Sequence, residues 1–139
     1  ACDHAVAAGD ALFRAPFARV GLIPDLGLLH TLPQRVGFGR AREMMLFAET
    51  MDARRAHEIG LVDRLCAPGD ALAEAKKRAL VLAELAPLSL ALTKTALAKG
   101  LEEALAQERE LQAALFMTAD HAEGKRAFLE KRAPVFRGA

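Results

Sequence analysis

The sequence predicts an α/β fold in which short strands and helices alternate up to about residue 68 and only helices follow. Two observations support this prediction. Short apolar runs bounded by glycine, proline and aspartate occur in the first region, as is typical of strands. Apolar residues at three- and four-residue spacing dominate the rest, as is typical of helices. No linker or repeat interrupts the chain. The pattern shifts once, from mixed strand and helix to helix alone near residues 66–70, so we expect two regions, residues 1–68 and 69–139.

The first region holds three candidate strands, residues 4–8, 11–13 and 61–66. Gly9 and Asp10 form a turn signal between the first two strands, and Pro68 and Gly69 form another after the third. Three segments between the strands carry helical spacing, residues 27–36, 39–49 and 53–59. We therefore expect the chain to enter a sheet midway and then to become helical.

The second region is expected to be helical throughout. Asp70 is a candidate N-cap, because its side-chain oxygen can accept a hydrogen bond from a free amide of the first turn. Pro87 separates the first two helices, and Gly100 suits the left-handed conformation that often ends a helix. The expected helices are residues 71–85, 88–99, 101–117 and 123–132.

Composition excludes several functional classes. Nineteen Lys and Arg residues against eighteen Asp and Glu residues leave a net charge of +1, which does not favour nucleic acid or an anionic membrane as a partner. No apolar run approaches the roughly twenty residues of a membrane-spanning helix. Cys2 and Cys66 form no metal-binding spacing, so we expect inert buried thiols in a reducing cytoplasm.

Motifs of known chemistry are scarce. The histidines show no spacing that indicates a metal site or a catalytic triad, and we expect surface or boundary positions for them; they are His4, His30, His57 and His121. His30 is the exception, because it would lie about one helical turn beyond Pro24 and Asp25 and could border the same cavity. We expect no metal site.

Two long segments carry a family resemblance. Residues 17–65, FARVGLIPDLGLLHTLPQRVGFGRAREMMLFAETMDARRAHEIGLVDRL, and residues 123–136, EGKRAFLEKRAPVF, resemble the crotonase superfamily of enoyl-CoA hydratases and isomerases in sequence and in order. The resemblance implies the second half of a crotonase-like β/α spiral core, followed by a helical C-terminal region. It also implies that the oxyanion hole lies in a missing N-terminal half, so that this chain alone would be inactive.

The resemblance implies an acyl-CoA substrate and a single catalytic carboxylate. Family hydratases use two glutamates, and the position of the second is Phe17 here. Asp25 matches the acid that many family isomerases carry in a GL(I/V)PD turn, where one carboxylate can move a proton between two carbons. A surrounding apolar wall would exclude water and favour the protonated form during the transfer; its expected members are Phe17, Leu22, Ile23, Leu26 and Leu28.

Other interpretations of these residues remain open. Taken without the family, Asp25 would serve as the N-cap of the following helix. The parent protein could instead be an enoyl-CoA hydratase or another CoA-thioester enzyme. It could also be a catalytically silent crotonase-like subunit that contributes only oligomer contacts or CoA binding.

The C-terminal segment carries the expected coenzyme A contacts. Phe128 and Lys131 match family positions that reach the adenine and the phosphates of CoA. Without the family, they would be a core phenylalanine and a solvated lysine on a terminal helix. The resemblance implies no cofactor beyond the CoA of the substrate, and a homo-oligomer, a trimer or hexamer, in fatty acid metabolism.

Overall fold

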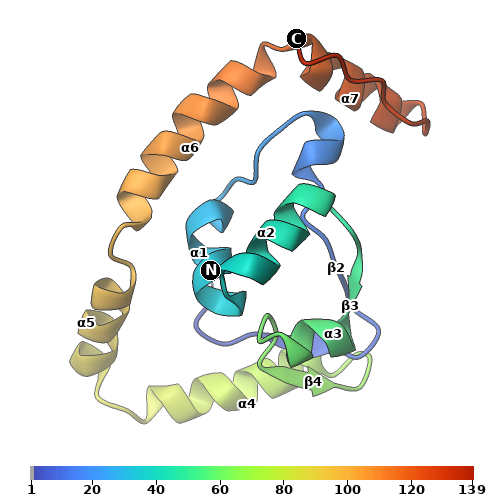
Figure 1. The fold of residues 1–139 in the computed structure, drawn as a ribbon. Coiled ribbons are helices and arrows are strands. Elements are labelled where there is room, and N and C mark those ends of the chain that lie inside the picture. Colours follow the sequence, from blue (N-terminus) through green and yellow to red (C-terminus); the bar gives the residue numbers. More distant parts are fainter. Residues whose placement is uncertain (1) are drawn as a thin grey trace. The chain divides into compact units, whose positions relative to one another are not determined.

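The computed structural model describes residues 2–139. The chain forms two compact units: the N-terminal segment through Phe13 joins Met51–Leu101, and Arg14–Thr50 joins Glu102–Ala139. The chain thus leaves the first unit after Phe13, returns to it at Met51 and leaves it again after Leu101. The mixture of strands and helices confirms the predicted α/β class (Figure 1).

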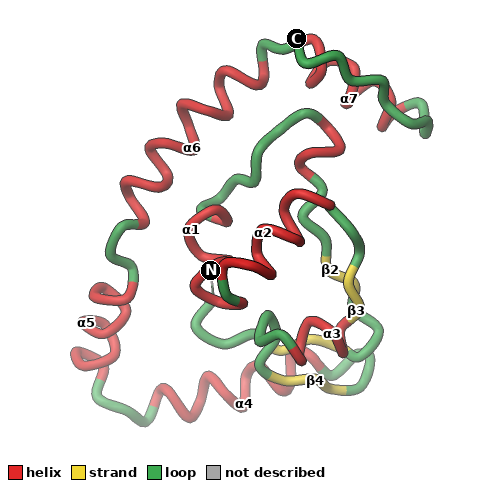
Figure 2. The backbone as a smooth tube through the Cα atoms, in the orientation of Figure 1, coloured by secondary structure: helices red, strands yellow, loops and turns green. Residues whose placement is uncertain are grey.

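The first unit contains all the strands that the structure assigns within residues 2–139 (Figure 2). Strand β1 (Val6–Ala8) pairs in parallel with β4 (Arg64–Cys66), with Ala7 opposite Leu65. Strand β2 (Leu12–Phe13) pairs antiparallel with β3 (Met51–Asp52). The three predicted strands are confirmed. Strand β3 was missed because its two residues stand between two segments of helical spacing, residues 39–49 and 53–59, with no glycine or proline beside them.

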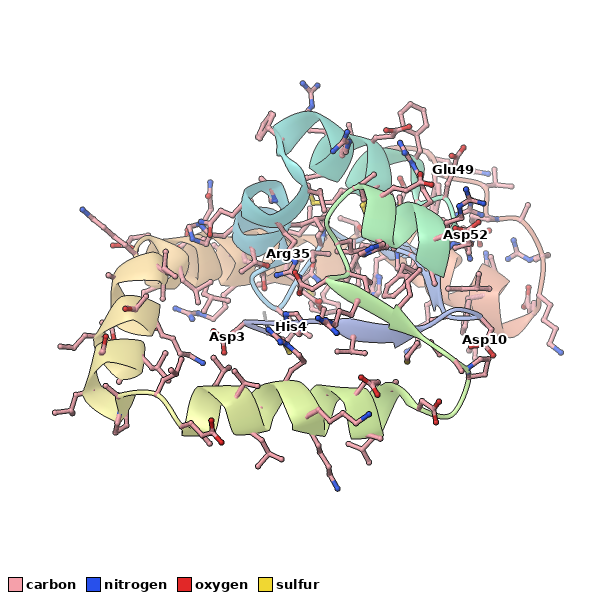
Figure 3. The ribbon with its side chains drawn as sticks, turned by 90° about the horizontal axis from the view of Figure 1, so that it is seen from below. Asp3, His4, Asp10, Arg35, Glu49 and Asp52 are labelled. Carbon is pink, nitrogen blue, oxygen red and sulfur yellow. The ribbon has the colours of Figure 1, made fainter. Side chains whose placement is uncertain are left out.

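Small side chains form the core of the first unit. Ala7, Ala56 and Val62 are buried together. Partly buried neighbours complete the cluster: Ala11, Phe13, Met51 and Leu61. Helix α3 (Ala53–Glu58) contributes Ala56 and begins at Asp52, labelled in Figure 3, whose carboxylate accepts a hydrogen bond from the Arg55 amide at 2.7 Å. A capping aspartate thus joins the end of β3 to the start of α3.

Two further helices belong to this unit, α4 (Ala71–Ala83) and α5 (Pro87–Leu97). The predicted cap at Asp70 is wrong. Asp70 occupies the N-cap position with φ −92° and ψ −5°, which is helical rather than extended, and its side chain accepts no cap hydrogen bond. Pro87 stands at the start of α5, where its missing amide hydrogen costs nothing.

Side chains near the N-terminus tie that segment to the rest of the first unit. Figure 3 shows Asp3 and His4 at the start of β1. Asp3 forms an ion pair with Lys94 of α5, and the pKa of its carboxyl is lowered by the hydrogen bond from Lys94. His4 lies 3.5 Å from the Asp63 carboxylate, which also accepts the Ala5 amide. The N-terminal segment is therefore held by residues 58–91 positions away.

The cysteines differ from expectation. Cys2 is exposed, and Cys66 is half-buried with its thiol 3.4 Å from the Ala7 carbonyl. Burial, reinforced by the Asp70 carboxylate, raises the pKa of the Cys66 thiol. The prediction of buried thiols is therefore wrong for Cys2 and only partly met for Cys66.

The second unit is helical. It contains the 3-10 helix η1 (Phe17–Val20), α1 (Leu28–Val36), α2 (Phe38–Phe47), α6 (Leu101–Phe116) and α7 (Ala119–Leu129). Helices α1 and α2 lie side by side (Figure 1). The α2 helix ends at Ala48, whose φ is 51° and whose carbonyl accepts hydrogen bonds from Arg14 at 3.0 Å and Arg19 at 3.2 Å. The two guanidinium groups therefore satisfy the end of α2 and hold the η1 segment against it.

Helix α7 begins four residues earlier than predicted. Thr118 is its N-cap, with the side-chain oxygen accepting the His121 amide at 3.1 Å. The helix ends at Leu129, so Lys131 lies beyond it, with a left-handed φ of 54°.

Within residues 2–139, no helix by itself has the length and apolar content to cross a membrane, although α4 and α5 meet both criteria when joined across their 111° bend.

Candidate functional site

Asp25 lies in a tight turn between η1 and α1. It follows the buried Pro24 and is itself half-buried. Its carbonyl accepts the Leu28 amide at 3.0 Å, and the two residues between have positive φ, 56° at Leu26 and 75° at Gly27. Positive φ at both central residues is the signature of a type I′ turn. The turn therefore fixes the backbone from which the Asp25 side chain projects.

The capping interpretation of Asp25 is wrong. The N-cap of α1 is Gly27, and no side chain makes a cap hydrogen bond there. Within residues 2–139, no hydrogen bond or ion pair engages the Asp25 carboxylate. The Asp25 carboxylate therefore does not cap helix α1.

Two buried polar residues of α6 hold the turn from the side. A carboxylate oxygen of Glu108 accepts the Gly27 amide at 2.9 Å. The side-chain amide of Gln112 accepts the Ile23 amide at 3.2 Å and donates to the Ile23 carbonyl at 3.3 Å. Residues on both sides of Asp25 are therefore bonded to α6, more than 80 positions later in the chain.

Helix α7 holds the η1 end of the same segment. A Cβ atom on Gly124 would lie 2.7 Å from the Cα of Val20, and one on Gly21 would lie 2.9 Å from the Cα of His121. The Nδ1 atom of His121 lies 2.9 Å from the Val20 carbonyl oxygen, within hydrogen-bond distance. The approach of α7 to η1 thus depends on two glycines, one on each side of the contact.

The residues proposed to surround Asp25 all belong to the second unit. Four side chains are partly buried: Phe17, Leu22, Ile23 and Leu28. Leu26 is 86% exposed and points away from the packed part of this unit. His30 lies in α1, with its Nε2 atom 2.7 Å from Nε2 of Gln34. The apolar wall and the role of His30 stay predictions.

The proposed CoA contacts lie at the end of α7. Phe128 is 73% exposed, so the alternative of a core phenylalanine is wrong for this chain. The Lys131 amide donates to the Phe128 carbonyl at 3.2 Å, and the Arg132 amide donates to Ala127 at 3.0 Å, which closes the helix. A shallow hollow of about 220 Å³ lies on the same helix, and neither Phe128 nor Lys131 lines it; its lining residues are Ala122, Lys125, Arg126, Leu129 and Glu130. The role in CoA binding stays a prediction.

Glu123 ties the C-terminal segment to α7. One carboxylate oxygen accepts hydrogen bonds from Arg132 and from the Val135 amide at 3.1 Å, and the other accepts from Arg126 and Arg132. These partners, Arg132 foremost, hold the pKa of Glu123 well below its usual range. The same contact raises the pKa of Arg132. The carboxylate therefore acts as an anion at neutral pH.

Asp120 completes this attachment by accepting the Arg137 amide at 2.7 Å and the Gly138 amide at 2.8 Å. Figure 1 shows the C-terminal segment running back beside α7. A hollow of about 540 Å³ lies along it, lined by Ala119, Asp120, Glu123, Arg126, Arg132, Val135, Arg137 and Ala139. Neither this hollow nor the smaller one is lined by Asp25.

The residues of this site that were not predicted from the sequence are Glu108, Gln112, Glu123 and Gly124. A signal for the first two was present, because they continue the four-and-three spacing of the apolar face of α6; the members are Leu101, Leu105, Glu108, Gln112 and Leu115. Polar residues at apolar-face positions indicate a buried hydrogen-bonding partner.

Within residues 2–139, no three His, Cys, Asp or Glu side chains gather to hold a metal ion.

Comparison with known proteins identifies the family. The enoyl-CoA hydratase/isomerase family model matches residues 1–139. The chain is 38% identical over 141 residues to the 2,3-dehydroadipyl-CoA hydratase of Escherichia coli, with 99% of this chain and 55% of the relative covered. It is 34% identical over 139 residues to the crotonyl-CoA hydratase of Syntrophomonas wolfei, with 97% and 54% covered.

A solved structure agrees with these sequence matches. The enoyl-CoA hydratase/isomerase of Pseudoalteromonas atlantica superposes with a TM-score of 0.88 at 36% identity, covering 98% of this chain and 56% of that one. The chain spans about half the length of the curated relatives it matches.

Proposed function

Because the chain belongs to the enoyl-CoA hydratase/isomerase family and has the crotonase fold, we propose that the complete protein moves the double bond of an enoyl-CoA thioester, with Asp25 as its acid and base. The observation that carries the proposal is the state of the Asp25 carboxylate. It projects from a turn bonded on both sides to α6, yet no partner within residues 2–139 engages it.

The chemistry requires one carboxylate. Asp25 would take a proton from C2 of a 3-enoyl thioester, which leaves a dienolate conjugated with the thioester carbonyl. Return of the same proton to C4 gives the 2-enoyl isomer, so atoms and charge balance without another reactant. The partly buried Phe17 and Leu22 would limit access of water that could compete for the proton.

Hydration of a 2-enoyl thioester is the second candidate, because the relatives from Escherichia coli and Syntrophomonas wolfei are named hydratases. Phe17 argues against it. This residue stands where the family resemblance places the second hydratase glutamate, and a phenyl ring cannot hold or activate water.

The proposal extends to binding and assembly. Phe128 and Lys131 would contact the CoA of the substrate, since an exposed aromatic face suits a purine and an ammonium suits a phosphate. We also propose a cytoplasmic homo-oligomer, a trimer or hexamer. Large apolar side chains on α4 and α5 support it, including Leu72 at 68%, Leu88 at 78% and Leu92 at 70% exposure.

The test is to assay the complete protein with a 3-enoyl-CoA and a 2-enoyl-CoA, and then its Asp25→Asn variant. We expect isomerisation in the unmodified protein and a fall of roughly 10²- to 10⁴-fold in the variant, with the unfolding midpoint nearly unchanged. Water addition as the main reaction would favour the hydratase alternative. Absence of both reactions would favour a silent subunit, and near-normal isomerisation by the asparagine variant would overturn the role of Asp25.

A further inference from the structure

Two side chains stand out among the described residues, Glu108 and Gln112. They are the polar side chains that the structure buries within residues 2–139, at 6% and 7% exposure. Both lie on α6, one helical turn apart, and both bond to the segment that carries Asp25. Burial of a carboxylate is costly unless hydrogen bonds compensate it, so this arrangement requires an explanation beyond packing.

We propose that Glu108 is a positioning residue for Asp25, acting through the Gly27 amide, with Gln112 fixing the other side of the turn at Ile23. The inference rests on the proposed function, because it concerns the direction of the carboxylate that moves the proton. Neither residue touches the reacting atoms; each sets the backbone from which Asp25 projects.

The geometry of the turn explains why an outside acceptor is needed. The Leu28 amide closes the turn onto the Asp25 carbonyl, and the Gly27 carbonyl accepts from His30 and Thr31 at the start of α1. The Gly27 amide has no hydrogen-bond acceptor within the turn, and the Glu108 carboxylate is its acceptor. A backbone amide left unsatisfied in a buried place destabilises the conformation that contains it.

The turn also contains a strained backbone conformation at Leu26, which other contacts must stabilise. Leu26 has a φ of 56°, a left-handed conformation that a leucine rarely adopts, and its side chain is 86% exposed, so packing contributes little to keeping it there. Hydrogen bonds at Ile23 and Gly27 enclose this residue and Asp25 on both sides. A proton transfer depends on placement within fractions of an ångström, and displacement of about 1 Å can cost roughly 10²-fold in rate.

The experiment uses variants of the complete protein that either keep or remove the acceptor. Glu108→Gln keeps an oxygen for the Gly27 amide, so we expect kcat within about threefold of the unmodified protein. Glu108→Leu removes the acceptor, and we expect kcat to fall roughly 10- to 100-fold with little change in KM. Glu110→Leu, at an exposed glutamate of the same helix, is the matched control and should leave kcat unchanged.

A second comparison separates positioning from a general loss of structure. In an Asp25→Asn background, Glu108→Leu should lower kcat by less than about twofold, because the group that it positions is already gone. Hydrogen exchange at the Gly27 amide should be slow in the unmodified protein and in Glu108→Gln and fast in Glu108→Leu. An equal loss of kcat in both backgrounds, or a Glu108→Leu variant with normal kcat, would overturn the inference.

The two proposals fail in different ways. If Asp25→Asn lowers kcat and Glu108→Leu does not, only the positioning role is overturned. If Asp25→Asn retains normal turnover, the catalytic assignment is overturned, and the positioning role that depends on it falls as well.

Discussion

Gly124 of α7 lies against Val20 of η1 so closely that a Cβ atom on the glycine would stand 2.7 Å from the Val20 Cα. Helix α7 thereby reaches the segment that leads into the Asp25 turn, and His121 adds a 2.9 Å contact to the Val20 carbonyl. The C-terminal helices are therefore part of the support of the candidate site. Helices α6 and α7 contact the segment around Asp25, although both lie far from it in the sequence.

Replacement of this glycine tests the close approach. We expect Gly124→Ala to lower the free energy of unfolding by about 1–3 kcal/mol, because the added methyl would overlap backbone atoms that cannot move independently. Gly39→Ala is the matched control, since a Cβ there meets nothing within 4 Å and alanine favours the helix. Denaturant unfolding measures both variants, and equal stability for the two would contradict the packing argument.

The strained residue of the turn gives a prediction of opposite sign. We expect Leu26→Gly to raise the free energy of unfolding by up to about 1 kcal/mol, because glycine adopts a φ of 56° without a Cβ penalty. Leu26→Ala keeps the Cβ atom and serves as the control, with stability close to that of the unmodified protein. If alanine and glycine have the same effect, the positive φ is not a source of strain.

The CoA contact can be tested independently of catalysis. We expect Lys131→Ala to weaken CoA-thioester binding roughly 3- to 10-fold while kcat changes less, because the contact would be remote from the reacting carbons. Phe128→Ala should act similarly. Lys131→Gly removes the same side chain but suits the φ of 54°, so it should weaken binding without lowering the unfolding midpoint. Calorimetric titration gives the affinities, and unchanged values in all three variants would leave both residues without a role in binding.

The attachment of the C-terminal segment predicts a dependence on pH. Arginine contacts lower the pKa of Glu123 from its ordinary value of 4.5, so the stabilisation is fully present above that value and is lost as the pH falls below it. We expect Glu123→Gln to be less stable at neutral pH and to lose less stability between about pH 5 and pH 2. Unfolding midpoints measured across that range give the answer; parallel curves for the two proteins would contradict the role of the anion.

The capping contacts of the helices could not be read from the sequence. Asp70 and Thr118 both precede helices and both have capping side chains, but only Thr118 accepts a cap hydrogen bond. Asp70 has helical backbone angles, which turn its side chain away from the first-turn amides. Whether such a side chain caps its helix depends on the backbone angles at the N-cap residue, and the residue type alone does not determine these angles.

The sequence by itself determined the α/β class, the family, the three predicted strands and the segment in which Asp25 stands. These features can be predicted because each depends on residues that are close together in the sequence, either as a periodic apolar pattern or as a short motif. Only the tertiary structure decided that Asp25 is not a cap, that Glu108 and Gln112 hold its turn, and that Glu123 fastens the C-terminal segment. The contacts of Glu108 and Gln112 join residues more than 80 positions apart, and a hydrogen bond between distant residues leaves no period in either segment.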